Sequence, residues 1–337
     1  MINTPTAEEW DAFVLQHPRG HILQLSAWGD LKSQYGWDAD RVAVCNANGD
    51  VVAGAQILFR PLPMRLGTMA YIPFGGYVTA DEQWPALWQA VREVSKKHGA
   101  AFLKWEPGFY TDEHVPDFAA MGFKESPQTV QPPNTIMLDI SDSEDDILAR
   151  MNQGTRRKIR KSLKNDIAYI EAVPEQVAQF TDLMQVTGER NDFGVHEPSY
   201  YALQHQLFVP DHAALILAQH EGEILAGVFV FAVGDTAQYI SGASSNVNRN
   251  LMASYGVQWQ GIQWAKARGC HTYDMWGIPD EPEDQLEAQF QERSDGLWGV
   301  YGFKRGWGGQ VIRSAGAWDM VYNPLIYGAY KVAIAVR

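Results

Sequence analysis

Hydrophobic and polar positions follow the same order twice along the chain. At 42–54 and again at 215–227, two apolar segments flank a polar turn that contains Gly49 or Gly222, a pattern that predicts a β-hairpin. Each hairpin precedes a strand, a helical segment and a further strand. The copies lie about 170 residues apart, so the repeated unit has the size of a domain. We therefore expect two copies of one α/β fold, with a ligand site in the cleft between them.

Periodicity and capping signals place the individual elements. Apolar residues recur with helical spacing in 82–98, and Gly99 suits the position just after a helix end. Capping-type starts occur at 6–9 and 141–144. We predict strands at 68–72, 101–105, 134–140, 168–171 and 236–242, and helices at 6–17, 26–36, 82–98, 144–151, 154–164, 174–189, 198–208 and 253–268.

The length of 337 residues also favours two domains. The second capping signal places their boundary, so we expect a first domain at 1–143 and a second at 144–322. The last segment, 323–337, is apolar on most of its faces. It predicts a helix buried against the first domain. The alternative is a membrane-surface anchor, which should contain more Lys and Arg.

Composition limits the location and the partners. The start lacks a basic region followed by an apolar run, and no apolar run is long enough to span a bilayer, so we expect a cytoplasmic protein. Cys45 and Cys270 are expected to be buried free thiols. The net charge of −13 argues against a general nucleic-acid coat, yet 156–164 holds six basic residues and no acidic one. That segment predicts a local anion site or else a solvated helix face.

Several kinds of chemistry lack their motifs. The chain has no nucleophile elbow, no phosphate-binding P-loop and no dinucleotide-binding glycine motif. Its nine His residues are scattered without metal-binding spacing. We therefore expect neither a metal nor a resident cofactor.

The order of elements fits one fold class. We predict an α/β (α+β) protein with two tandem GCN5-type N-acetyltransferase-like domains, each a mixed, mostly antiparallel twisted sheet flanked by helices. Enzymes of this fold hold the coenzyme A pyrophosphate at a glycine-rich turn before the central helix. The turn at 248–256 has Arg249 but lacks those glycines, and 74–76 has glycines without a neighbouring cation. The fold indicates acyl transfer, while the loops argue against an acyl-CoA donor.

A series of short motifs spans nearly the whole chain. The first, at 23–32, reads Leu-Gln-x-x-x-Trp-x-x-x-Lys. In their order and spacing the motifs resemble those of the Fem family of peptidoglycan interpeptide-bridge aminoacyltransferases. No heptad pattern predicts the coiled-coil arm of some members, so the chain resembles the short form. The further motifs lie at 71–76, 102–107, 156–164, 187–193 with Tyr200 and Tyr201, 239–244 and 302–309.

The resemblance implies a reaction and its partners. The donor would be an aminoacyl-tRNA, and the acceptor would be the side-chain amine of residue three of a peptidoglycan precursor stem peptide. The resemblance leaves open whether the precursor is the UDP-linked muramyl pentapeptide or its lipid-linked form, and with it a peripheral contact with the membrane. We expect a monomer, because the two repeats already supply each other's partner surface.

The resemblance also indicates residues that bind the precursor. Trp28 and Lys32 belong to the first motif, and Lys32 is expected to pair with the precursor's diphosphate, a role that suits a point cation. Glu106 stands where the family often has a carboxylate lining the cleft. Tyr200 and Tyr239 resemble cleft tyrosines. A surface lysine, a loop acid and two core tyrosines would explain the same residues.

His196 departs from the family pattern. Shorter members can have an Arg four residues before the first tyrosine of the helix, and His196 stands at that distance from Tyr200. His lacks the bidentate, permanently charged fork of Arg. We include His196 among the substrate-binding residues and expect weaker binding of a UDP diphosphate there.

Phe303 and Lys304 carry the strongest prediction for catalysis. In the family this pair lies where the aminoacyl end of the donor meets the acceptor. A fixed ammonium on Lys304 could stabilise the oxyanion of a tetrahedral intermediate or hold the terminal nucleotides of tRNA. Phe303 and Trp307 could stack a terminal base, although core packing also explains Trp307. No residue stands out as a general base.

Basic residues complete the predicted donor site. Arg305 follows the catalytic pair, and Arg156, Arg157 and Arg160 lie in the basic segment. We expect all four to contact tRNA phosphates.

Two other functions stay open. The first is an acyl-CoA-dependent N-acyltransferase on the same fold, despite the missing glycine turn. The second is a non-catalytic module that binds cell-wall precursors. The intact Phe303–Lys304 pair argues against that module, and His196 argues mildly for it.

Overall fold

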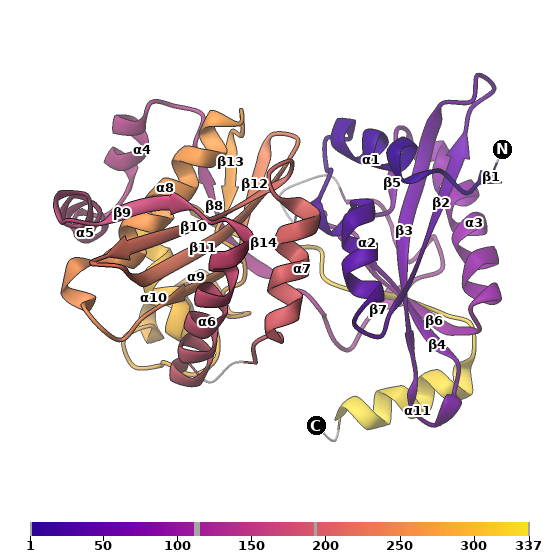
Figure 1. The fold of residues 1–337 in the computed structure, drawn as a ribbon. Coiled ribbons are helices and arrows are strands. Elements are labelled where there is room, and N and C mark those ends of the chain that lie inside the picture. Colours follow the sequence, from indigo (N-terminus) through magenta and orange to yellow (C-terminus); the bar gives the residue numbers. More distant parts are fainter. Residues whose placement is uncertain (1, 111–114, 192–193, 336–337) are drawn as a thin grey trace. The chain divides into compact units, whose positions relative to one another are not determined.

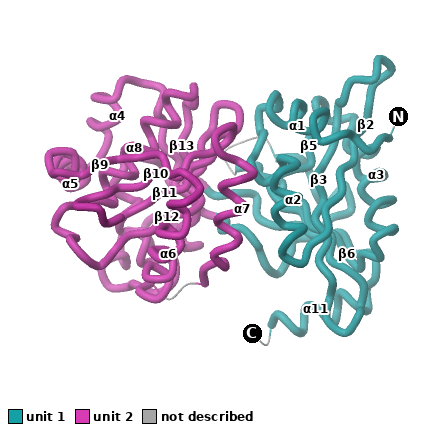
Figure 2. Tube along the Cα trace, in the orientation of Figure 1, with its two compact units in different colours: residues 1–133, 313–337 teal, residues 134–312 magenta. Residues whose placement is uncertain are grey.

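The computed structural model describes residues 2–110, 115–191 and 194–335 of the chain. The chain folds into two compact units, 1–133 with 313–337 and 134–312 (Figure 2). Each unit has its own sheet and its own hydrophobic core. The ends of two segments named above, Asp192 with Phe193 and Val336 with Arg337, lie outside the described residues.

The first unit is built on an eight-stranded sheet with the order β1-β2-β3-β4-β6-β15-β7, in which β5 also pairs with β3 (Figure 1). Its strands are β1 (Ile2–Asn3), β2 (Asp38–Cys45), β3 (Val51–Pro61), β4 (Thr68–Pro73), β5 (Tyr77–Val78), β6 (Ala100–Glu106), β7 (Lys124–Glu125) and β15 (Trp318–Val321). Its helices are α1 (Ala7–Gln16), α2 (Ser26–Ser33), α3 (Trp84–Lys97) and α11 (Pro324–Ala335), with the 3₁₀ turns η1 (Ile22–Gln24), η2 (Pro63–Arg65) and η3 (Asp81–Gln83).

The second unit is built on a seven-stranded sheet with the order β14-β8-β13-β12-β11-β10-β9. Its strands are β8 (Asn134–Asp139), β9 (Ala168–Glu171), β10 (Ala213–His220), β11 (Glu223–Val233), β12 (Thr236–Ser244), β13 (Thr272–Asp274) and β14 (Gln310–Arg313). Its helices are α4 (Glu144–Arg150), α5 (Gln153–Lys164), α6 (Val177–Asn191), α7 (Pro198–Phe208), α8 (Ala253–Ala267), α9 (Glu283–Gln289) and α10 (Trp298–Lys304), with the 3₁₀ turns η4 (Pro174–Gln176), η5 (Arg249–Leu251) and η6 (Arg305–Trp307).

Both units repeat one topology, as the hydrophobic pattern predicts. An antiparallel hairpin, β2–β3 or β10–β11, continues into an antiparallel third strand. A helix, α3 or α8, then crosses to a strand that pairs parallel with the third one, β4 with β6 and β12 with β13. A parallel pair needs such a crossover, so the helix between each pair is a consequence of the strand order.

Alternation along β11 explains why helices cover both faces of the second sheet. Val228 and Val230 point into the core that α8 fills. Phe229 lies between them in sequence and meets Phe180 of α6 edge-to-face on the opposite side. Successive strand residues face opposite sides of a sheet, so one strand supplies both layers.

Each sheet also contains a strand that follows the repeat of the other unit in the sequence. β8 follows the first repeat but pairs with β13 of the second unit, with Leu138 opposite Tyr273. β15 follows the second repeat but pairs with β6 of the first unit, with Met320 opposite Leu103. The structure puts 134–140 in the second unit and 313–322 in the first, unlike the predicted bounds, because periodicity predicts a strand without naming its partner.

The C-terminal segment is a helix, as predicted, but only one of its faces is buried. Tyr327 of α11 is 3% exposed and packs edge-to-face on Phe102 of β6. Leu325 is 87% exposed and Val332 is 66% exposed. In the described ranges no helix combines the length and the apolar character needed to cross a membrane.

A buried ion pair joins β6, β15 and α11. Nζ of Lys104 lies 3.2 Å from Oδ1 of Asp319, and both side chains are at most 1% exposed. The hydroxyl of Tyr327 donates to the other carboxylate oxygen at 2.8 Å. Lys104 also donates to the carbonyl oxygen of Gln128 at 2.7 Å. Because every charged atom has a partner, the pair fixes the returning C-terminal segment to the first sheet.

Asp319→Asn should destabilise the first unit by about 3–5 kcal/mol, because it leaves the Lys104 ammonium buried without its counter-charge. Denaturant unfolding measures this loss. The double variant Lys104→Met/Asp319→Asn should recover part of it, and Glu125→Gln on the exposed neighbouring strand should change little. A single variant as stable as the native chain would contradict the role given to the pair.

Candidate functional site

Lys304 is a buried lysine at the end of a short helix. Helical spacing puts it on the same face of α10 as Trp298 and Tyr301, and all three side chains are buried. Lys304 is 6% exposed, and its Nζ donates to the carbonyl oxygens of Trp276 at 3.1 Å and Gly277 at 2.7 Å. The two aromatic residues therefore set the face that carries the ammonium into the unit.

The turn that receives Lys304 is held in a left-handed conformation. Trp276 has φ +62°, which is rare and costly for a residue with a large side chain. Its backbone N–H donates to Oδ1 of Asp274 at 2.7 Å, and the Thr135 hydroxyl donates to the same oxygen. Asp274 is 3% exposed at the end of β13. This buried carboxylate fixes the two carbonyls that face Lys304.

Burial lowers the pKa of Lys304 to about 7, although the nearby Asp274 charge acts in the opposite direction. Burial likewise raises the pKa of Asp274. The pKa of Lys304 therefore lies well below that of an exposed lysine. Perturbed groups of this kind concentrate where proteins carry out chemistry.

A cavity of about 260 Å³ opens beside Lys304 within the second unit. It lies at a bulge between β11 and β12, where Phe229 pairs with Ser241 and Val230 pairs with Tyr239. Bulges often redirect side chains next to active sites. The wall includes Tyr239, Arg249, Tyr255, Gln258, Phe303 and Lys304.

Tyr239 and Lys304 lie next to each other in this cavity. Nζ of Lys304 is 5.6 Å from the centre of the Tyr239 ring. A Cβ on Gly242 would lie 1.9 Å from the Tyr239 hydroxyl oxygen, so only glycine leaves room for that hydroxyl. Burial raises the pKa of Tyr239 to about 12, which keeps it a neutral O–H donor at physiological pH.

A second cavity of about 410 Å³ lies at the N-terminus of α8 and includes Lys158 and Arg249. Asn248 (φ +52°) and Met252 (φ +62°) take the left-handed conformation that glycines often supply. Met252 is the N-cap and makes no side-chain capping bond. A helix N-terminus flanked by two cations favours an anion. Both cavities include Arg249 and Tyr255, so they adjoin.

The basic helix α5 lines a groove of about 550 Å³. Arg157 and Arg160 are exposed along it. Arg156 instead donates to the carbonyl oxygens of Ala149 at 3.0 Å and Met151 at 2.5 Å, at the C-terminal end of α4. Arg156 therefore has a capping role that does not require a phosphate.

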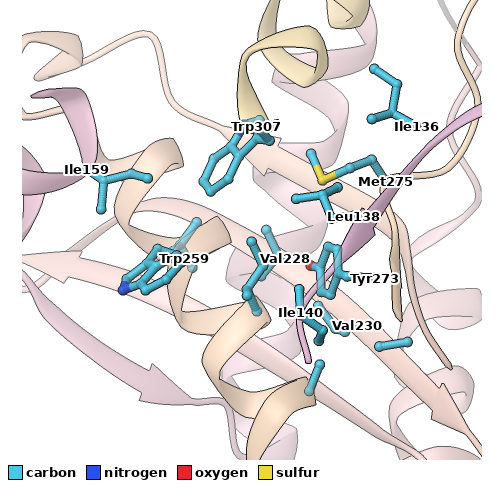
Figure 3. Close-up of a cluster of buried hydrophobic side chains, with 14 of the residues drawn as sticks. Ile136, Leu138, Ile140, Ile159, Val228, Val230, Trp259, Tyr273, Met275 and Trp307 are labelled. Atoms are coloured by element: carbon cyan, nitrogen blue, oxygen red, sulfur yellow. The ribbon is translucent and has the colours of Figure 1, made fainter. Parts of the chain in front are cut away.

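Arg305 and Trp307 have partners within the second unit. Arg305 forms a two-pronged hydrogen bond with Glu287, one prong of which measures 2.8 Å. Trp307 is 1% exposed and lies in the core with Met275 and Ile136, as Figure 3 shows. This burial favours core packing over the stacking of a terminal base as the role of Trp307. Phe303 is half-buried and lines the cavity.

In the first unit, Lys32 lies one helical turn after Trp28, with Nζ 5.6 Å from the indole ring. Burial lowers the pKa of Lys32 to about 8, and the charge of Arg60 contributes to the same shift. Arg60 in turn lies 5.3 Å from the ring of Trp37. Two cations at close range repel each other, and an anion placed between them relieves that repulsion.

Glu106 is 4% exposed at the end of β6. Its carboxylate accepts hydrogen bonds from the Tyr71 hydroxyl, from the N–H of Val130 at 2.5 Å and from the N–H of Gln131 at 3.1 Å. Burial raises its pKa. These contacts fasten the connection before β8 to the first sheet. They explain the buried carboxylate without a substrate.

His196 and Tyr200 lie against each other at the start of α7. Their rings stack with centroids 3.8 Å apart at 16°. His196 is exposed, whereas Tyr200 is 3% exposed. The imidazole therefore covers the tyrosine ring, and of the two it is His196 that a ligand would meet.

Comparison with known proteins places the chain. A model described as the FemAB family matches residues 5–223 and 219–334. The chain belongs to the FemAB family. The resemblance noted in the motifs is thereby confirmed.

Relatives of this FemAB chain are transferases by name. Lipid II:glycine glycyltransferase of Staphylococcus aureus (strain USA300) is 26% identical to this chain, over an alignment that covers 96% of this chain and 93% of the relative. The crystal structure of FemX matches with a TM-score of 0.88 and 25% identity, over 98% of this chain and 99% of that one.

A more distant structure supports the fold alone. A tandem GNAT protein from the clavulanic acid biosynthesis pathway matches with a TM-score of 0.55 and 13% identity, over 95% of this chain and 97% of that one. The predicted class of two tandem acetyltransferase-like domains is therefore confirmed.

The sequence did not point to one polar residue in the wall of the cavity beside Lys304. Gln258 of α8 is fully buried, and its Nε2 donates to the Tyr273 hydroxyl at 2.8 Å. Its Oε1 has no hydrogen-bond partner among the described residues. Gln258 stands between two apolar neighbours, Val257 and Trp259, and a polar residue on a buried helix face is the signal that could have found it.

The stability of the native chain should rise with pH relative to Lys304→Met between about pH 7 and pH 10. The folded-state pKa of Lys304 lies near 7, below its ordinary value, so in this window the unfolded chain binds more protons than the folded one. Such a difference makes stability rise with pH by at most about 1.4 kcal/mol per unit.

Denaturant unfolding of both proteins across this range measures the effect. Lys266→Met is the matched control, because its Nζ also donates to backbone carbonyls, those of Ile140 and Ser141, outside the cavity. Parallel pH profiles for the native chain and Lys304→Met would contradict the lowered pKa.

Proposed function

We propose that this chain transfers an aminoacyl group from aminoacyl-tRNA to the side-chain amine of residue three of a peptidoglycan precursor stem peptide. The observation that carries the proposal is Lys304, buried with a pKa near 7 in the wall of a cavity of the second unit. The name of the staphylococcal relatives, lipid II:glycine glycyltransferase, supports a peptidoglycan precursor as the acceptor.

In this proposal the 3′ end of the donor occupies the two adjoining cavities. Its terminal phosphates lie at the N-terminus of α8 beside Lys158 and Arg249, and its aminoacyl ester reaches Lys304. Arg157 and Arg160 on α5 contact phosphates further along the acceptor stem. Phe303 packs against the terminal ribose or base. The cations on this path either line a cavity or are exposed to solvent.

The chemistry requires stabilisation of a developing charge. The acceptor amine attacks the ester carbonyl, a C–N bond forms, and the C–O bond to the ribose breaks. The carbonyl oxygen carries negative charge in between, and the Lys304 ammonium stabilises it with the Tyr239 hydroxyl as a second donor. The proton lost by the amine passes to the leaving ribose hydroxyl. Lys304 keeps its two carbonyl partners, which hold the ammonium in place.

The precursor's diphosphate is proposed to bind in the first unit. Lys32 and Arg60 form a pair of cations whose repulsion an anion would relieve. Trp28 supports the stem of Lys32. His196 is proposed to contact the stem peptide of the precursor rather than its diphosphate, because an imidazole carries a positive charge only when it is protonated.

The cavity at α8 also favours a second candidate. An acyl-CoA would place its pyrophosphate at the same helix N-terminus between Lys158 and Arg249. Titration with acetyl-CoA, followed by calorimetry, separates the two donors. Saturable binding together with acetylation of an amine acceptor would replace the tRNA proposal.

Lys304→Met should lower turnover by about a hundredfold to a thousandfold, because it removes one oxyanion donor. The assay combines a mixed pool of charged tRNAs with a UDP-linked muramyl pentapeptide or its lipid-linked form, and mass spectrometry detects the added aminoacyl residue. Binding of the stem peptide should be nearly unchanged, and Lys266→Met should transfer like the native chain. Native turnover by Lys304→Met would sink this assignment, and no transfer by the native chain to either acceptor would favour a non-catalytic binding module.

Lys32→Gln should raise KM for the precursor about tenfold with a much smaller effect on kcat, because a charge-assisted phosphate contact is lost from ground state and transition state alike. Steady-state kinetics with a varied precursor concentration measures this split. Lys97→Gln, at an exposed lysine of α3, serves as the charge-matched control. An equal fall in kcat and kcat/KM would instead give Lys32 a role in the chemical step.

A further inference from the structure

One face of α11 is apolar and exposed. Leu325, Ala329 and Val332 follow each other at helical spacing, with Leu325 87% and Val332 66% exposed. The opposite face carries Ile326, Tyr327 and Tyr330, which pack against the first sheet. The helix therefore uses one apolar face for its own unit and presents another outward.

The tip of the β3–β4 hairpin extends this surface. Met64 at the tip is 86% exposed. Leu62 and Met69, on either side of it, pack in the same cluster as Ile326 and Tyr330, so the hairpin and α11 lie side by side (Figure 1). We call the exposed set of Met64, Leu325, Ala329 and Val332 the apolar ridge.

The backbone at the tip of the hairpin is strained. Met64 has φ +56° and Arg65 has φ +58°, so two consecutive residues other than glycine take the left-handed conformation. This conformation costs free energy at each of them. The first core gains nothing from it, because Met64 points into solvent.

The charged residues on the two segments that carry the apolar ridge are of one sign. Arg65 and Lys331 flank it, and neither α11 nor the segment 57–72 contains an acidic residue. Lys124 lies 4.3 Å from the ring of Tyr327 beneath the helix. The whole chain has a net charge of −13, so these two acid-free, cationic segments depart from its average.

We propose that the apolar ridge and its flanking cations dock on the surface of an anionic phospholipid bilayer. The apolar side chains would enter the boundary between headgroups and acyl chains, while Arg65 and Lys331 meet lipid phosphates. α11 lies in the interface and does not span it. A second copy of this chain fits less well. A two-fold contact through the ridge would bring the same cations of both copies together, with no carboxylate on these segments to pair with them.

This docking goes beyond the proposed transfer reaction and does not require it. If the reaction is as proposed and its acceptor is lipid-linked, docking would raise the local concentration of acceptor at the enzyme. The lipid test therefore uses vesicles that contain no peptidoglycan precursor. Its failure would leave the transfer proposal untouched, and failed transfer would leave the docking result standing.

The experiment is flotation of the full chain with vesicles of equal parts phosphatidylglycerol and phosphatidylcholine, compared with vesicles of phosphatidylcholine alone. The native chain should bind the anionic vesicles, and less so at high salt. Met64→Asn/Leu325→Asn/Val332→Asn should weaken binding about tenfold or more. Arg65→Gln/Lys331→Gln should weaken it by a similar factor.

Matched variants separate docking from general surface properties. Leu163→Asn/Val173→Asn replaces exposed apolar residues of the second unit, and Lys96→Gln/Lys97→Gln neutralises two exposed lysines of α3. Both should bind vesicles like the native chain, and circular dichroism should show that every variant is folded. Absence of native binding, or equal binding by the ridge variant, would overturn the proposal. A native dimer lost in the ridge variant, without vesicle binding, would overturn it in favour of a second copy.

Discussion

The site depends on one costly interaction, the burial of the Lys304 ammonium against two backbone carbonyls. Carbonyl oxygens satisfy the hydrogen bonds of an ammonium but do not cancel its charge. The nearby Asp274 charge offsets this only in part, because the effect of burial is larger. The pKa of Lys304 falls to about 7 as a result. A negative charge that develops in the cavity would find a cation with few competing partners.

The fold supplies the parts of this arrangement from distant segments. β13 ends at Asp274, whose carboxylate holds the left-handed turn at Trp276. α10 orients Lys304 through the two aromatic residues on its buried face. The bulge in β12 then places Tyr239 beside it. Each device costs some stability locally, and the core of the second unit, from Ile136 to Trp307, supports all of them.

Local pattern predicted many elements up to residue 268 well, but it predicted none of α9, α10, β14 and β15, and it predicted strand partners poorly. The segments 168–171 and 198–208 form a strand and a helix with the predicted bounds, because periodicity and flanking prolines or turns mark them. The pairing of β8 and β15 across the repeats escaped prediction, since a strand of four to six residues does not specify its neighbour. The motif around Lys304 identified the residue. Its lowered pKa could not be read from that motif, because it arises from burial, and the turn that covers Lys304 lies 27 residues earlier in the chain.

The central claim is that Lys304 has an unusually low pKa at the proposed donor end of the site. The most direct measurement is an NMR titration of the chain with ¹⁵N-labelled lysine, with and without a non-hydrolysable amide analogue of an aminoacylated terminal adenosine. The account predicts one lysine with a pKa near 7 that is absent from Lys304→Met and shifts when the analogue binds. A Lys304 pKa near 10.5, or a signal that saturating analogue leaves unmoved, would contradict it.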